Sequence, residues 1–121
     1  MSARAALAIV LTLLLPAVVD AHAVLVKSSP TRRAVLAVPP TRVELTFNER
    51  LEPAYSTVSV WSAAQAQVDD GKIVVRQDDP RRLSFGLPSL AAGAYTVKFR
   101  VLSVDGHLVE GTYPFEIRPR P

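Results

Sequence analysis

Apolar and polar residues alternate along several short stretches of the chain, which is the pattern of strands that bury one face. Residues 42–48 are the clearest case, because Val43, Leu45 and Phe47 share one side and the residues between them are polar. Residues 94–102 alternate in the same way and form the longest such stretch. Period-two alternation of this kind indicates half-buried β-strands.

Turn-forming residues separate these stretches at intervals of about 8 to 12 residues, and no stretch has a convincing helical period. The pattern predicts an all-β fold, an immunoglobulin-like antiparallel β-sandwich (a Greek-key barrel) of about seven strands. Pro114 in the last strand indicates an edge position or a bulge, because proline cannot donate a ladder hydrogen bond. The expected strands are residues 22–30, 42–48, 56–61, 72–76, 82–85, 94–102 and 112–117.

The first 21 residues have the composition of a secretory signal peptide. Arg4 supplies a positive charge, residues 5–19 are almost all apolar, and residues 19–21 form a small-residue cleavage site. The apolar run is shorter than the roughly 20 residues that cross a bilayer, which favours cleavage over the alternative of a retained membrane anchor. We therefore expect a signal peptide at residues 1–21 and one exported domain at residues 22–121.

Composition narrows the chemistry that the domain can support. The chain has no cysteine, and its one methionine is Met1, which would be lost with the signal peptide. Thiolate metal sites, cysteine nucleophiles and Cu(I) sites of the thioether type are therefore not expected. The formal net charge is +3, and the basic residues are scattered without aromatic residues among them. This arrangement gives little support to nucleic-acid binding.

The chain has two histidines, His22 and His107. If cleavage follows residue 21, His22 becomes the first residue, and its α-amine and imidazole can close a chelate ring on a metal. His107 follows Asp105 in an Asp-Gly-His turn, where Gly106 permits the reversal that lets both side chains face one point. A set of nitrogen and oxygen ligands of this kind suits tetragonal Cu(II). The alternative is that His22 is incidental and His107 merely completes a turn.

Longer motifs connect the chain with a known family. H-A-V-L-V-K-S-S-P begins at His22, V-E-L-T-F-N-E-R-L lies in the first third, and L-x-A-G-x-Y-T-V-K-F-R-V-L-S-V-D-G-H-L-V-E-G-T-Y-P-F-E-I lies near the end. Through these motifs residues 22–121 resemble the CopC-type periplasmic copper-resistance family along their whole length. The resemblance implies an immunoglobulin-like domain that binds Cu(II) in copper homeostasis or resistance.

The resemblance also implies a set of metal ligands. They would be the amine and imidazole of His22, the carboxylate of Asp105 and the imidazole of His107. In some members a glutamate of the L-x-F-x-E segment lies at the same site, which corresponds to Glu49 here; a surface salt bridge would explain that residue without a metal. Certain members add a methionine-rich Cu(I) loop, which this chain lacks, so the resemblance implies the Cu(II) function alone.

The expected function is that of a monomeric, non-catalytic carrier in the periplasm. It would buffer copper or deliver it to a CopD-type inner-membrane protein, a partner that the resemblance implies. The alternative is a small copper monooxygenase, because lytic polysaccharide monooxygenases share an N-terminal histidine and a second histidine. A secreted β-sandwich without a metal is a third possibility.

Overall fold

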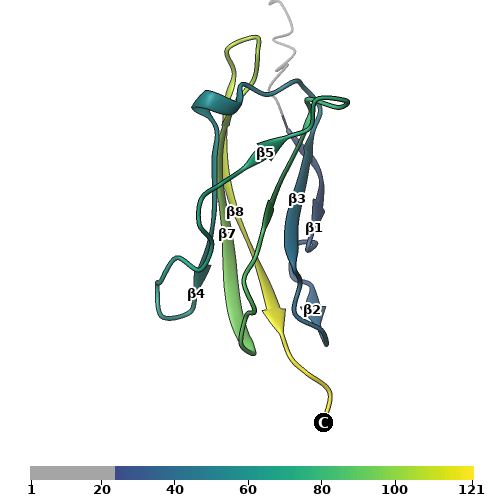
Figure 1. Cartoon of the computed structure of the whole chain (residues 1–121), viewed down its shortest axis with the longest axis vertical. Helices are drawn as coiled ribbons and strands as arrows, with labels where there is room; N and C mark the ends of the chain where they lie inside the picture. The colour runs from purple at the N-terminus through teal and green to yellow at the C-terminus, as the bar shows by residue number, and fades with distance from the viewer. Residues whose placement is uncertain (1–23) are drawn as a thin grey trace, which may run out of the picture.

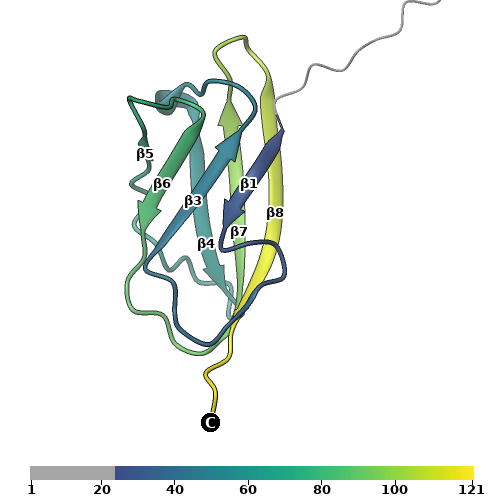
Figure 2. The same ribbon diagram turned by 90° about the vertical axis from the view of Figure 1, so that its right-hand side faces the viewer.

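A computed structural model of the chain describes residues 24–121, which form two four-stranded β-sheets packed face to face (Figures 1 and 2). The first sheet has the strand order β1 (Leu25–Ser29), β3 (Arg42–Phe47), β6 (Arg82–Gly86) and β5 (Val74–Val75). The second has the order β2 (Val35–Leu36), β8 (Leu108–Ile117), β7 (Gly93–Leu102) and β4 (Thr57–Ser62). The all-β sandwich that the sequence predicts is confirmed.

The strand set differs from the expected one in several details, one of which is that β5 spans only Val74–Val75 of the expected residues 72–76. The two-residue strand β2 was not expected, and it pairs parallel to β8 through Val35 with Glu116 and Leu36 with Ile117. All other strand pairs are antiparallel. Strand β8 also begins earlier than expected, because the ladder with β7 runs without interruption to the pair of Leu102 and Leu108.

Pro114 lies within β8, which has a neighbouring strand on each side. Its carbonyl accepts a hydrogen bond from the Arg33 backbone N–H at 2.7 Å, so this side of Pro114 faces the segment that leads into β2. Because β2 pairs with β8 only at Glu116 and Ile117, no ladder donor is needed at Pro114. The proline therefore pairs with Thr96 of β7 on one side and behaves as an edge residue only toward β2.

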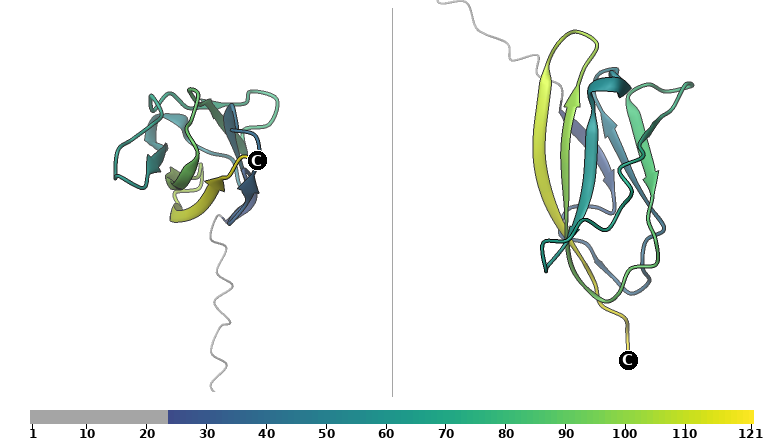
Figure 3. Two further views of the ribbon diagram at one scale, coloured as in Figure 1. Left: turned by 90° about the horizontal axis from the view of Figure 1, so that it is seen from below. Right: turned by 60° about the vertical axis from the view of Figure 1, so that its left-hand side comes forward.

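The two sheets face each other (Figure 3). The core lies between them and consists of the side chains on the inward face of each strand. In β3 the side chains of Val43, Leu45 and Phe47 are buried, as the alternation predicts. Tyr95 and Val97 of β7 are buried on the facing sheet. The other buried apolar residues are Leu51, Val58, Val60, Leu83, Phe85, Leu90, Val101, Tyr113, Phe115 and Ile117.

The two ends of the sandwich carry different parts of the chain. The β7–β8 loop, the segment that follows β3 and the β5–β6 turn lie at one end, and the C-terminus lies at the other (Figures 1 and 3). The segment after β3 continues into one 3₁₀ turn at Pro53–Tyr55. Across residues 24–121, none of the helical segments has the length and apolar character required to cross a membrane.

Candidate metal centre

Three loops meet at the end of the sandwich opposite the C-terminus, and backbone hydrogen bonds join them. The Val104 N–H donates to the Arg50 carbonyl at 2.9 Å, and the Glu52 N–H donates to the Leu102 carbonyl at 2.8 Å. These two bonds tie the β7–β8 loop to the segment after β3. The Leu51 N–H donates to the Pro80 carbonyl at 2.9 Å and ties in the β5–β6 turn.

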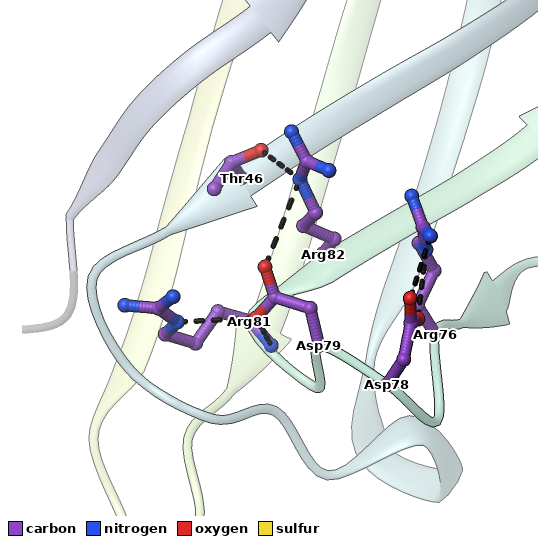
Figure 4. A network of polar contacts seen from close by, with 6 residues as sticks. All are labelled: Thr46, Arg76, Asp78, Asp79, Arg81 and Arg82. Atoms are coloured by element: carbon purple, nitrogen blue, oxygen red, sulfur yellow. Dashed lines mark hydrogen bonds and ion pairs between the residues drawn. The ribbon is translucent and has the colours of Figure 1, made fainter.

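The β5–β6 turn is held by its own ion pairs (Figure 4). Asp79 lies 3.1 Å from the Arg81 guanidinium and 3.8 Å from that of Arg82, and Asp78 lies 2.7 Å from Arg76. The Arg82 guanidinium also donates to the Thr46 hydroxyl at 3.4 Å. Each carboxylate of this turn thus pairs with a neighbouring arginine, and Arg82 also contacts β3 through a neutral hydroxyl.

The β7–β8 loop is a tight turn that brings Asp105 and His107 to the same side. The Ser103 N–H donates to the His107 carbonyl at 2.9 Å, and the Gly106 N–H donates to the Ser103 carbonyl at 3.0 Å. Gly106 has a φ of 89°, in the region that favours glycine. The residue type at 106 thus explains how two side chains separated by one residue can point at one place.

Glu49, Asp105 and His107 form a cluster in which one possible ligand atom from each residue lies within 4.8 Å of the others. The His107 Nδ1 atom lies 3.2 Å from Asp105 Oδ2 and 3.8 Å from Glu49 Oε2. The Asp105 side chain is 46% exposed and that of Glu49 is 22% exposed. The cluster is therefore open to solvent on the Asp105 side and enclosed on the Glu49 side.

The electrostatics of the cluster favour a cation. The pKa of Asp105 is lowered from its ordinary value, chiefly by the hydrogen bond from the Ser103 hydroxyl, and the His107 imidazole acts in the same direction. Asp105 is therefore held as a carboxylate, the form that binds metals. The Glu49 Oε2 atom is buried and accepts no hydrogen bond from residues 24–121. An imidazole and two carboxylates without sulfur fit a borderline divalent ion.

The structure thus brings together three of the four residues that the sequence indicates, namely Glu49, Asp105 and His107. The fourth, His22, lies outside the described residues. The nearest described position is Val24, whose N–H donates to Asn48 Oδ1 at 2.6 Å and whose carbonyl accepts from the Asn48 N–H at 3.1 Å.

Sequence reasoning did not identify the role of Asn48. Its contact joins residues 24 positions apart, and Asn48 follows a strand, where asparagine commonly ends a strand for local reasons. Nothing in the local sequence pattern distinguishes an asparagine that merely ends a strand from one that also binds the backbone of Val24. The pairing of β1 with β3, which places Leu25 opposite Phe47, is what brings Val24 and Asn48 together.

Comparison with known proteins supports a family assignment. A family model described as the CopC domain matches residues 25–118. "Protein YobA" of Escherichia coli (strain K12) is 33% identical over 118 residues, which cover 97% of this chain and 95% of the relative. "Copper transport protein CutJ" of Bacillus subtilis (strain 168) is 34% identical over 104 residues, 85% of this chain. The chain spans only 19% of the length of CutJ.

Among solved structures, the chain is similar to the crystal structure of CopC from Methylosinus trichosporium OB3b. The two share 43% sequence identity with a TM-score of 0.78, over 83% of this chain and 97% of the other. The family model, the motifs and this structural likeness agree over the same two-sheet domain. This chain belongs to the CopC domain family.

Proposed function

We propose that this protein binds Cu(II) through His22, Glu49, Asp105 and His107 and serves as a carrier in copper homeostasis or resistance. The observation that carries the proposal is the cluster of Glu49, Asp105 and His107 at one end of the sandwich. Membership of a family whose relatives include a copper transport protein and copper resistance proteins supports copper as the cargo.

The anchoring of Val24 supports His22 as the remaining ligand. Val24 is hydrogen-bonded to Asn48, the residue before Glu49, so the chain enters the first strand beside the cluster. Two residues of extended chain span about 7 Å at most. If His22 is the N-terminal residue, it precedes this anchored position by only two residues, and its amine and imidazole would add two nitrogens to the ligand set that Cu(II) prefers.

The proposal includes export and maturation. Residues 1–21 act as a signal peptide, and their removal leaves a domain of residues 22–121 in the periplasm with His22 at its N-terminus. There the domain is monomeric and binds copper without catalysing a reaction. It buffers the ion or passes it to a CopD-type inner-membrane protein. The open Asp105 side of the cluster supports transfer, because an incoming acceptor ligand can approach the metal there.

The test is a titration of Cu(II) into protein whose N-terminus is confirmed as His22 by intact mass. We expect one copper per protein and a tetragonal, nitrogen-rich EPR spectrum. The same protein with one additional N-terminal residue should bind more weakly with an altered spectrum, because its amine no longer forms a chelate ring with the His22 imidazole. Identical spectra from the two forms would contradict the assignment of His22.

A second pair of variants tests the ligand role of Glu49. Glu49→Gln should weaken binding, because an amide is a poorer ligand than a carboxylate. Glu44→Gln is the matched control, since Glu44 lies on β3 and pairs with Arg42 at 3.5 Å outside the cluster. Equal affinities for the two variants would remove Glu49 from the ligand set.

Release of soluble oxidised oligosaccharides from chitin or cellulose in the presence of ascorbate would instead favour the monooxygenase alternative.

A further inference from the structure

Ser103 occupies the junction of the two loops that carry the clustered side chains. It forms an isolated antiparallel bridge with Leu51, between the two backbone hydrogen bonds that join the loops. Its side chain is 1% exposed, so its hydroxyl is shielded from water. A hydroxyl in such a place must find its partners within the protein.

The Ser103 hydroxyl contacts both residues of the Asp-Gly-His turn that face the cluster. It donates a hydrogen bond to Asp105 Oδ1, and it accepts one from the His107 backbone N–H at 3.1 Å. A hydroxyl has a single proton to donate, so this proton is committed to Oδ1. The other carboxylate oxygen, Oδ2, is the one that lies 3.2 Å from His107 Nδ1. The two oxygens of Asp105 therefore have different neighbours.

The Ser103 hydroxyl is not needed to close the turn. The backbone bonds from Ser103 N–H to the His107 carbonyl and from Gly106 N–H to the Ser103 carbonyl already close it. What the hydroxyl adds is control over the rotation of the Asp105 carboxylate. A carboxylate that is already oriented loses less rotational freedom when it binds a metal.

We propose that Ser103 is a positioning residue for metal binding: its hydroxyl holds Asp105 through Oδ1, so that Oδ2 is presented to the metal together with His107. This inference rests on the proposed function, because it assumes that the cluster binds Cu(II). Ser103 itself does not contact the metal. It acts through the orientation of Asp105 and through the backbone of His107.

The experiment compares three variants in protein that begins at His22. Ser103→Ala removes the hydroxyl, Ser103→Thr keeps it, and Ser84→Ala removes another buried serine hydroxyl that contacts Arg42 on the first sheet instead of the cluster. Cu(II) affinity is measured by competition with a chelator, and the EPR spectrum is recorded for each variant. Melting temperature and amide hydrogen exchange at His107 are measured without metal.

We expect Ser103→Ala to bind Cu(II) at least about tenfold more weakly, the usual effect of losing a group that orients a ligand, and to give an altered EPR spectrum. Amide exchange at His107 should accelerate, because the hydroxyl no longer accepts its hydrogen bond. Ser103→Thr should retain the wild-type affinity and spectrum even if its added methyl lowers the melting temperature. Ser84→Ala should match the wild type in copper binding.

Wild-type affinity and an unchanged spectrum in Ser103→Ala would overturn the inference and leave the proposed function intact. The same loss of affinity in Ser84→Ala or Ser103→Thr would also overturn it, because stability and packing would then explain the effect. If the wild-type protein beginning at His22 binds no Cu(II), the proposed function fails, and the inference fails with it.

Discussion

Tyr113 is a core residue with a polar group that the fold keeps neutral. Its side chain is 3% exposed. Burial raises the pKa of Tyr113 to about 12, although its hydroxyl lies beside Ser28, which acts in the opposite direction. The folded protein therefore retains the phenol proton at pH values where an exposed tyrosine would lose it. The protonation of this residue is consequently coupled to folding.

We predict that alkaline pH destabilises the protein through Tyr113. Its ordinary pKa is 10.0 and its folded pKa is about 12, so the stabilising effect is complete below pH 10 and is lost as the pH rises toward 12. The loss attributable to this residue is about 2 to 3 kcal/mol. Urea unfolding followed by circular dichroism from pH 8 to pH 12 measures it.

Two variants separate Tyr113 from the other groups that titrate at high pH. Tyr113→Phe should lose less stability over this range than the wild type, because phenylalanine has no proton to release. Tyr55→Phe should lose as much as the wild type, since Tyr55 is 69% exposed. Parallel curves for Tyr113→Phe and the wild type would show that the phenol does not control the alkaline transition.

At the scale of elements, the β7–β8 hairpin is joined to β3 by aromatic packing near the cluster. Phe99 of β7 lies opposite Gly111 of β8 in the ladder. The Phe99 ring packs edge-on against Phe47, with ring centroids 5.8 Å apart. Because Phe47 is the last residue of β3, two positions before Glu49, this packing supports the start of a loop that contributes to the cluster.

We predict that Gly111→Ala destabilises the protein. A Cβ at this position would meet three atoms of the Phe99 ring at 2.5 to 3.1 Å, so that the ring must shift from its packed position beside Phe47. Overpacking of this kind costs about 1 to 2 kcal/mol of unfolding free energy. Chemical denaturation checks it, with Gly86→Ala as the control because no atom lies within 4 Å of its added Cβ. Equal stability of the two variants would contradict the prediction.

The elements differ in how well their sequences predict them. β3 and β7 bury one face and expose the other, so alternation alone locates them. β2 has two residues, Val35 and Leu36, which are too few to form a period, and its parallel pairing with β8 depends on a distant segment. The sandwich architecture was therefore predictable, whereas the strand that extends the second sheet was not.

The residues of the site also differ in whether neighbouring or distant parts of the chain determine their positions. The Asp105-Gly106-His107 turn is a local motif, and its geometry follows from glycine at the central position. Glu49 lies more than 50 positions earlier in the chain, and its place beside the turn follows from backbone bonds between loops. Only the family resemblance indicated that residue. Ser103 is close to Asp105 and His107 in sequence, but the structure was needed to show which atoms its hydroxyl contacts.

For the whole molecule, the cluster lies at one end and combines groups that respond to pH differently. Asp105 has a lowered pKa, so its carboxylate persists to a lower pH than that of an ordinary aspartate. Nitrogen ligands must be deprotonated to bind a metal, and imidazoles take up protons between about pH 8 and pH 5. Protonation of the nitrogen ligands therefore opposes metal binding in the proposed site.

We predict that the affinity for copper decreases as the pH falls from about 8 to about 5, the range in which imidazoles become protonated. Bound copper is measured after equilibration at each pH, and circular dichroism confirms that the protein remains folded. Asp105→Asn should bind more weakly at every pH and should therefore release copper at a higher pH than the wild type, because less competition from protons is needed to displace a weakly held metal. Affinity that does not change over this range would exclude imidazole ligands.

The C-terminus leaves the sandwich at the end away from the β7–β8 loop, as Figure 1 shows, and this loop carries Asp105 and His107. A chemical linker attached at Pro121 would therefore hold the protein on a bead or an electrode with its copper-binding loops directed toward the solution. A purification tag before His22 would have the opposite effect, because it would consume the amine on which the proposed chelate depends. Sensors made from this domain should accordingly be immobilised through their last residues.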